Sequence, residues 1–236
     1  MPGMNADESR LRADVALANR IIERTGLSNA FGHASARLPG TDTFLLPTRR
    51  SPGFAQPDTL LVVDTDGHVV AGDGSPNSEL WIHARIYAAR PEIGGCVHAH
   101  PESCVCLTQI GERHRVVHNQ GGPFYERVSE FDEIGLIRTR TLGDRLAQCL
   151  GGNIAAMMRG HGITTACTDV RTATVAAIFL EESASLQLRM MMATGGDAAR
   201  IRAFTAEESQ TLWDQLGPAI VGRAWEYYAG LADDLL

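Results

Sequence analysis

Two histidines, His98 and His100, lie one residue apart near the end of an apolar run, in the segment GGCVHAHPESC (94–104). In a β-strand, residues i and i+2 point to the same face of the sheet, so the two imidazoles would lie side by side. Such a pair can bind one metal ion, or it can be two polar residues at the end of a strand. The spacing alone does not decide between these interpretations.

A third histidine, His161, lies between two glycines in the segment RGHGITT (159–165), directly after an apolar run. Glycines there let the backbone turn sharply and let another group approach the imidazole closely. Taken alone, this histidine could be a simple turn residue. Together with His98 and His100, it would supply the three imidazoles of a site for zinc or a related divalent ion, with positions open for water or substrate.

A carboxylate that could complete such a site is Glu79, near the start of the segment SPNSELWIHARIYAARP (75–91). It could act as a general base or as a temporary metal ligand, although a glutamate in a first helical turn is also favoured by the helix dipole. His83 lies one turn further along the same face. It could orient Glu79 or be a half-buried helix residue, and we do not include it among the predicted ligands.

The overall composition excludes several classes of function. With 44% hydrophobic and 21% charged residues among 236, the chain is typical of a globular protein with one core. Its net charge of -7 offers no basic surface for nucleic acid or an anionic membrane. It shows neither a secretory signal nor an apolar run of the roughly 20 residues that a membrane-spanning helix needs. We therefore expect a cytoplasmic protein, and its five cysteines, which form no CxxC pair, predict free thiols.

Helical and strand patterns alternate in the first half of the chain. A helix is expected from Asp7, a candidate N-cap, to about Gly26. A second helix is expected before Pro91, with Asn77 or Ser78 near its N-cap. Short strands are expected between these helices, with a tight turn at Asp66–Gly67, at residues 34–38, 43–46, 59–64 and 68–70.

The second half continues this alternation, which predicts an α/β layer architecture with some antiparallel strands in a single domain. Strands are expected at 94–100, around Val116 and Val117, and at 154–158. The Gly- and Pro-containing segment 119–135 is predicted to be a long functional loop. Helices are expected at 103–110 (or an irregular piece), at 142–150 with Thr141 and Asp144 as a capping pair, at 169–192, and from Thr205 with Glu208 in a capping box.

Four segments, in this order, resemble the class II aldolase/adducin family: FGHASAR (31–37), SPNSELWIHARIY (75–87), VHAHPESCVCL (97–107) and RGHGITT (159–165). The family includes fuculose- and rhamnulose-phosphate aldolases, ribulose-5-phosphate 4-epimerase, and a branch of decarboxylases of hydroxylated aromatic or pyridine dicarboxylates. The resemblance covers approximately residues 10–195. It is specific because four ordered motifs agree.

The resemblance implies a three-layer αβα sandwich with a central mixed, largely antiparallel sheet, in one domain over residues 1–236. It also implies a homotetramer with active sites at the subunit interfaces. Position by position, His98, His100 and His161 match the family's metal ligands, and Glu79 matches its acid/base carboxylate. The expected cofactor is one divalent metal ion per subunit, zinc or manganese, with iron or cobalt as alternatives.

The differences from the sugar-phosphate members concern the site for the substrate anion. Where those members carry Gly-Asn, a Ser/Thr-Gly loop and Ser-Ser, this chain has Gly32-His33, the loop LLPTRRSP (45–52) and Asn77-Ser78. The pattern is closer to that of the decarboxylase branch. Guanidinium groups suit bidentate pairing with a carboxylate, although they also bind phosphate and can be solvated loop residues. The candidate substrate-binding residues are His33, Ser35, Arg49, Arg50, Asn77 and Ser78.

These residues predict a metal-dependent carbon–carbon lyase in which the cation stabilises an enolate-type intermediate and Glu79 transfers the proton. The preferred substrate is a hydroxylated aromatic or heteroaromatic carboxylate that is decarboxylated, and the second interpretation is a sugar-phosphate aldolase or 4-epimerase. A non-catalytic adducin-like interaction module and a metal-dependent oxygenase are alternatives from other classes. Further candidates for a proton donor, which could equally be packing residues, are Tyr125, Tyr227 and Tyr228.

Overall fold

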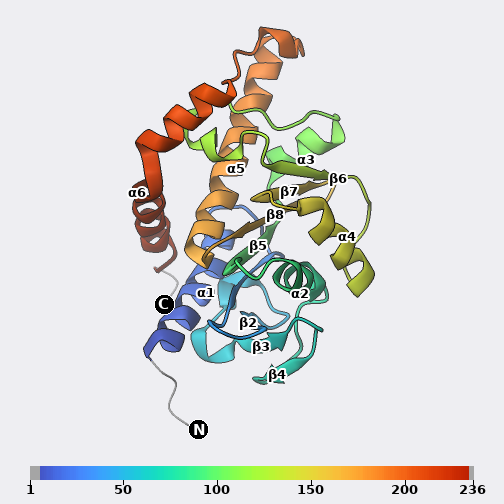
Figure 1. The fold of residues 1–236 in the computed structure, drawn as a ribbon, viewed down its shortest axis with the longest axis vertical. Coiled ribbons are helices and arrows are strands. Elements are labelled where there is room, and N and C mark those ends of the chain that lie inside the picture. The colour runs from blue at the N-terminus through green and yellow to red at the C-terminus, as the bar shows by residue number, and fades with distance from the viewer. Residues whose placement is uncertain (1–5, 234–236) are drawn as a thin grey trace.

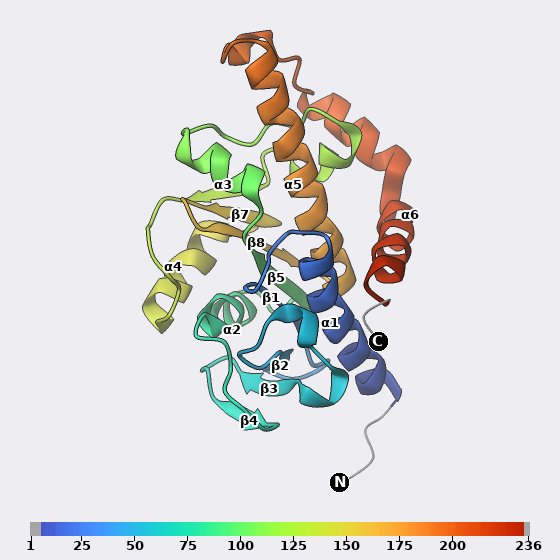
Figure 2. The same ribbon diagram turned by 180° about the vertical axis from the view of Figure 1, so that it is seen from behind.

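Eight strands form one sheet at the centre of the protein, with helices on both faces (Figures 1 and 2). The structure is a computed structural model and describes residues 6–233. The strand order is β4-β3-β2-β1-β5-β8-β7-β6, and every neighbouring pair is antiparallel except β6 and β7. This confirms the three-layer α/β fold with a mixed, largely antiparallel sheet.

The strands are short, and the central ones are fully buried. Their bounds are β1 (His33–Arg37), β2 (Thr43–Leu46), β3 (Leu61–Asp64), β4 (Val69–Ala71), β5 (Gly95–Ala99), β6 (Val128–Phe131), β7 (Ala155–Met158) and β8 (Gly162–Cys167). Central strands with helices on both faces must be apolar on both sides. This explains why β5 and β8 show no alternation of exposed and buried residues: every residue of both strands is buried.

Two hydrophobic clusters, one on each face of the sheet, hold the three layers together. One cluster joins the sheet to α2 (Leu80–Ala89) and α4 (Arg140–Leu150), and its members include Phe44 and Ile86. The other joins it to α1 (Ala6–Arg24), α3 (Glu102–Gln109), α5 (Val170–Ala193) and α6 (Ala206–Asp233). Figures 1 and 2 show α2 and α4 on one side of the sheet and α1, α5 and α6 on the other.

Several predicted helix ends are confirmed by their hydrogen bonds. The N-cap of α5 is Asp169, whose side chain accepts from Thr172 N at 2.8 Å. The capping box before α6 is formed by both expected bonds, between Thr205 and Glu208. Gly26, just beyond α1, has a left-handed backbone with φ of 75°, as a helix-terminating glycine does.

Other expectations about helix starts were wrong. Asp7 lies inside the first turn of α1 rather than at its N-cap. Thr139, not Thr141, caps α4, because its side chain accepts from Leu142 N. Asp144 instead forms an ion pair with Arg85 of α2, so its charge is used between helices rather than at a helix end.

The segment between α3 and α4 also differs from the prediction. No strand forms at Val116 and Val117, although Val116 O accepts from Phe204 N at 2.8 Å. The predicted loop 119–135 contains a 3₁₀ helix (Asn119–Phe124) and strand β6, which pairs in parallel with β7. The sequence of β6, VSEF, shows no alternation of apolar and polar residues, and the strand lies at the edge of the sheet, where it pairs only with β7. Strand β8, directly after the glycine turn, was also missed.

All five cysteines are free thiols, as expected. Among residues 6–233, no helix combines the length and the apolar character that crossing a bilayer requires.

Candidate metal centre and substrate cavity

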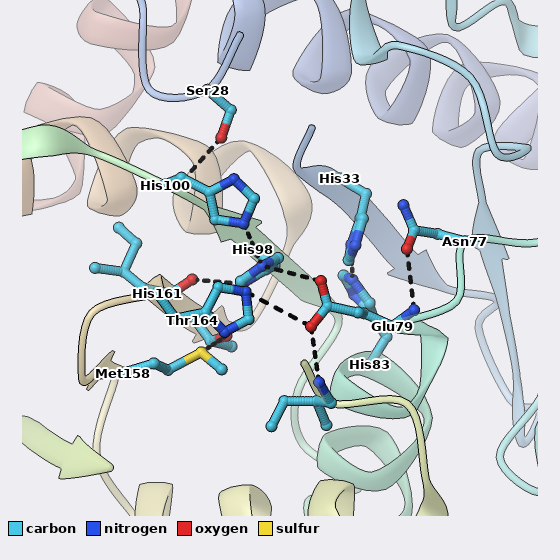
Figure 3. Close-up of polar contacts among 12 residues, drawn as sticks. Ser28, His33, Asn77, Glu79, His83, His98, His100, Met158, His161 and Thr164 are labelled. Atoms are coloured by element: carbon cyan, nitrogen blue, oxygen red, sulfur yellow. Dashed lines mark hydrogen bonds and ion pairs between the residues drawn. The ribbon is translucent and has the colours of Figure 1, made fainter. Parts of the chain in front are cut away.

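Three histidines, from the end of β5 and from the turn that leads into the neighbouring strand β8, converge near the centre of the sheet (Figure 3). His98 lies in β5, His100 follows directly after it, and His161 lies in the turn between β7 and β8. The ring centroids are 4.7 Å apart for His98 and His100, 4.9 Å for His98 and His161, and 5.2 Å for His100 and His161. The structure therefore brings together all three predicted ligands.

The glycines around His161 make this convergence possible. Gly160 has a left-handed backbone with φ of 63°. A Cβ atom on Gly162 would lie 2.2 Å from the carbonyl oxygen of Ala99 and 2.9 Å from Cδ2 of His100. Only a residue without a side chain lets the turn approach His100 this closely, as the sequence predicts.

Hydrogen bonding fixes which nitrogen of His98 faces the cluster. Nδ1 of His98 lies 2.9 Å from the carbonyl oxygen of Ile163, which can only accept, so Nδ1 carries the hydrogen. The lone pair of His98 is then on Nε2, which lies 2.9 Å from Nε2 of His100. A carbonyl behind a ligating histidine is the usual support for a metal-binding imidazole.

Glu79 lies immediately before α2, and its carboxylate faces the three rings. Oε1 is 3.6 Å from Nε2 of His161, and Oε2 is 3.9 Å from Nε2 of His98. Oε1 also accepts from the backbone N–H of Ile137 at 2.8 Å. Burial raises the pKa of Glu79, but the neighbouring His161 and His98 imidazoles and the Ile137 N–H together lower it to about 2. The carboxylate is thus ionised at neutral pH.

The four side chains fit a divalent cation. One ligand atom from each of Glu79, His98, His100 and His161 lies within 4.8 Å of the others. Both ring nitrogens of His161 are buried without a hydrogen-bond partner among residues 6–233. Burial lowers the pKa of His98 and of His100, which keeps both rings in the neutral form that binds metals. Three imidazoles and a carboxylate suit zinc, manganese, iron and cobalt alike.

A cavity of about 790 Å³ opens directly above this cluster. Its lining includes Glu79, His100 and His161. Its volume lies within the range that small-molecule sites occupy. The cavity is therefore the candidate substrate site.

Arginines from three separate segments line the cavity. Arg49 and Arg50 come from the loop after β2, as predicted, and Arg50 stacks on Phe54 with its guanidinium carbon 5.2 Å from the ring centroid. Arg138 and Arg159 were not predicted. Arg138 lies three residues beyond the predicted functional loop 119–135, and Arg159 immediately precedes the glycine turn of His161. Each lies close to a segment already predicted to be functional, but the sequence does not show whether a loop arginine points into a cavity or into solvent.

The remaining candidate substrate-binding residues fall into two groups. His33, Asn77 and Ser78 line the cavity, and Asn77 Oδ1 accepts from the backbone N–H of Glu79 at 3.0 Å. Ser35 does not line it. Its hydroxyl is buried behind His33, 2.6 Å from Nδ1 of His83 and 2.8 Å from Oη of Tyr87.

His83 is fully buried rather than half-buried, and it does not orient Glu79. Its Nε2 atom lies 2.5 Å from Nδ1 of His33, so it supports a cavity residue from behind (Figure 3). None of the three tyrosines considered as proton donors lines the cavity. Tyr228, for example, donates to Glu182 at 3.0 Å.

Comparison with known proteins agrees with this geometry. Residues 13–188 match the Class II Aldolase and Adducin N-terminal domain. The chain belongs to this family. A 3,4-dihydroxyphthalate decarboxylase from a Terrabacter species is 30% identical to it, over 96% of this chain and 98% of that protein.

A second sequence relative and a solved structure also resemble this class II aldolase family member. An L-fuculose phosphate aldolase from Methanococcus maripaludis is 24% identical, over 75% of this chain and 94% of that protein. The crystal structure of an aldolase II superfamily protein from Pseudomonas syringae superposes with a TM-score of 0.83 at 24% identity, covering 98% of this chain and 94% of that one. The resemblance read from the four sequence motifs is thus confirmed, and so is the fold.

Proposed function

We propose that this protein is a divalent-metal-dependent carbon–carbon lyase that decarboxylates a hydroxylated aromatic or heteroaromatic carboxylate. The observation that carries the proposal is the cluster of Glu79, His98, His100 and His161 at the base of a cavity lined by arginines. When bound there, a divalent cation supplies Lewis-acid polarisation of a chelating substrate and offsets the negative charge left when a carbon–carbon bond breaks.

The composition excludes one common alternative for stabilising that charge. The sequence contains no lysine: all 21 basic residues are arginines. A Schiff base between a lysine amine and a substrate carbonyl is the usual metal-free route for carbanion chemistry. Because no lysine is present in the chain, our proposal assigns this stabilisation to the histidine cluster.

Glu79 is placed to transfer the proton. Its carboxylate is ionised at neutral pH, because its pKa is about 2 in the protein. It therefore begins as a base and accepts the proton of a substrate hydroxyl close to the cluster. After carbon dioxide leaves, the same proton passes to the ring carbon that carried the carboxylate, and a solvent proton restores the hydroxyl.

The residues that line the cavity favour an aromatic, anionic substrate. Phe31, Ile134 and Leu136 line the cavity and are 70%, 76% and 42% exposed, so they offer apolar surface for a flat ring. Two arginines from separate segments of the lining, Arg49 and Arg138, can hold carboxylates bidentately. The decarboxylase relative, whose name specifies a hydroxylated aromatic dicarboxylate, points the same way.

A sugar-phosphate aldolase or 4-epimerase is the second candidate, favoured by the similarity to L-fuculose phosphate aldolase. Such an enzyme would use the same cluster but hold phosphate instead of carboxylate. A non-catalytic module is less well supported, because all the residues of the metal cluster are present. A homotetramer, which the family resemblance implies, and a cytoplasmic location are also part of the proposal, and light scattering of the purified protein tests the assembly.

The deciding experiment offers the metal-loaded protein two sets of substrates. One contains 3,4-dihydroxyphthalate and hydroxypyridine dicarboxylates, and the other contains fuculose 1-phosphate and ribulose 5-phosphate. Carbon dioxide, aldehyde and epimer are assayed separately. We expect carbon dioxide from the first set, with loss of activity on chelation; aldehyde or epimer from the second set, without carbon dioxide from the first, would reverse the ranking.

A further inference from the structure

A buried chain of hydrogen-bonding side chains lies behind His33, outside the cavity. It runs from Tyr87 through Ser35 and His83 to His33. Ser35 and His83 are both 0% exposed, and neither lines the cavity. Buried polar groups must each find a partner, so the hydrogens along this chain can be assigned by counting donors and acceptors.

The assignment begins at Tyr87. Its hydroxyl is buried 2.8 Å from Oγ of Ser35, and among residues 6–233 no other acceptor is within hydrogen-bond distance. The hydroxyl of Tyr87 therefore donates to Ser35.

Ser35 must then direct its own hydrogen elsewhere. Nδ1 of His83 lies 2.6 Å away, whereas the competing acceptor, the carbonyl oxygen of Cys96, lies 3.5 Å away. The shorter distance is that of a strong hydrogen bond, and the longer one is at the outer limit. Ser35 thus donates to Nδ1 of His83, which leaves the hydrogen of a neutral His83 ring on Nε2.

The same reasoning applies to the contact between the two rings. Nε2 of His83 and Nδ1 of His33 are 2.5 Å apart, so one of them carries a hydrogen and the other accepts it. Both rings are buried, 0% and 1% exposed, which favours their neutral forms. Because His83 donates from Nε2, Nδ1 of His33 accepts, and the hydrogen of His33 is on its other nitrogen.

We propose that Ser35 and His83 are positioning residues that hold His33 in the tautomer with its hydrogen on Nε2, so that the ring presents a neutral N–H donor to a carboxylate of the substrate. The tautomer follows from the hydrogen-bond chain alone. Its use in binding a carboxylate rests on the proposed function. The opposite tautomer would present a lone pair to the substrate, which would repel an anion.

This arrangement also explains why His33 is not a fourth metal ligand. His33 and His98 face each other on neighbouring strands, with ring centroids 5.2 Å apart. In this tautomer Nδ1 of His33 accepts from His83 and Nε2 carries a hydrogen, so neither nitrogen has a free lone pair for a cation. His33 is accordingly the one cavity-lining imidazole outside the cluster formed by His98, His100, His161 and Glu79.

The first test measures the tautomer directly and needs no substrate. Zinc-loaded protein with ¹⁵N-labelled histidines is studied by two-bond nitrogen–proton correlation NMR, with His33→Gln used to assign the His33 signals. We expect the Nε2–H pattern in the wild type, loss of that single pattern in Ser35→Ala, and its retention in Tyr87→Phe. The Tyr87 variant is the matched control, because it also removes one buried hydroxyl but leaves the donor to His83 in place.

The outcome that overturns the proposal is equally specific. An Nδ1–H pattern for His33 in the wild type would show that Ser35 donates to Cys96 instead. An unchanged His33 pattern in Ser35→Ala would show that the chain does not control the tautomer. Both results are readable whether or not the protein proves to be a decarboxylase.

The second test uses steady-state kinetics with 3,4-dihydroxyphthalate. In His83→Leu the donor to His33 is lost, so we expect KM to rise roughly ten- to a hundredfold, the value of a hydrogen bond to a charged group, with kcat little changed and zinc content retained. His83→Gln, whose amide can still donate to Nδ1 of His33, should recover most of the loss. Equal KM values in His83→Leu and wild type would contradict the positioning role. A wild-type protein that is inactive on every carboxylate would instead refute the proposed function, and the NMR test of the tautomer would still be valid.

Discussion

The Nε2 atoms of His98 and His100 face each other at 2.9 Å. Because His98 carries its hydrogen on Nδ1, its Nε2 offers a lone pair, and without a cation His100 must supply the hydrogen between them. With a cation present, both rings can offer lone pairs to the same centre. The two rings are thus arranged to bind one cation between them.

Replacing His100 with Ala should remove most of the bound metal. The expected loss of affinity exceeds the roughly 10- to 100-fold that loss of an outer contact to a metal ligand costs. Elemental analysis of the purified, dialysed protein measures it. His68→Ala is the matched control, since His68 pairs with Asp64 in the exposed hairpin far from the cluster. Full metal content in His100→Ala would contradict the ligand assignment.

Gly162→Ala should weaken both the fold and the metal site. The new methyl group would meet the Ala99 carbonyl oxygen at 2.2 Å and His100 at 2.9 Å, so β8 must shift away from β5. Such overpacking costs about 1–3 kcal/mol in the free energy of unfolding. Gly222→Ala, in α6 with no atom within 4 Å of its Cβ, should instead stabilise the protein, by about 0.5–1 kcal/mol. Denaturant unfolding compares the two, and equal stability would show that the close approach is not required.

Arg138→Ala should raise KM for a dicarboxylate substrate about tenfold, as expected for an exposed guanidinium that pairs with a carboxylate. The effect should shrink at high salt, because ions screen exposed charges. Arg140→Ala is the control: this arginine lies two residues away, outside the cavity, and pairs with Asp66. Identical KM values for the two variants would remove Arg138 from the substrate site.

The metal-free protein should lose stability as the pH falls below 6.5. Burial lowers the pKa of His83 to about 3, and that of His114 to about 4, with a smaller contribution from His118 in the second case. Between these values and 6.5 the unfolded chain binds a proton at each histidine that the folded chain does not, so acid favours unfolding. Each group contributes a slope of about 1.4 kcal/mol per pH unit.

The contribution of one histidine can be isolated with His114→Gln. His114 lies away from the cluster, 2.8 Å from Oγ of Ser183. Urea unfolding between pH 4 and 6.5, in the presence of a chelator, should give a slope smaller by up to about 1.4 kcal/mol per pH unit than in the wild type, with the largest difference near the middle of this range. A slope unchanged by the substitution would mean that His114 titrates normally in the folded protein.

The metal cluster could be predicted from the sequence because its ligands carry local signals. His98 and His100 are spaced for one face of a strand, and His161 is flanked by glycines that allow a close approach. The three-layer fold was predicted from the four ordered motifs, whereas the alternation of helical and strand patterns predicted only an α/β architecture. Strands β6 and β8 were missed because neither alternates apolar and polar residues: β6 (VSEF) is a short edge strand, and β8 (GITTAC) is buried throughout and carries two threonines.

The hydrogen-bonded residues behind the cavity, Ser35 and His83, were harder to predict from the sequence. Ser35 and His83 are 48 positions apart in the chain, and they meet only because β1 lies beside α2 in the folded protein. A serine in a strand and a histidine in a helix carry no sign of this contact. The same holds for Arg138 and Arg159, whose direction depends on how two loops fold over the sheet edge.

The most direct test of the central claim is a crystal structure of the zinc-loaded protein, with anomalous diffraction used to locate the metal. Our account predicts one ion, bound by one ring nitrogen each of His98, His100 and His161 at about 2.0–2.1 Å, with Glu79 as a fourth ligand or within hydrogen-bond distance of one. An ion bound elsewhere, or a site in which His161 stays outside coordination distance, would contradict it.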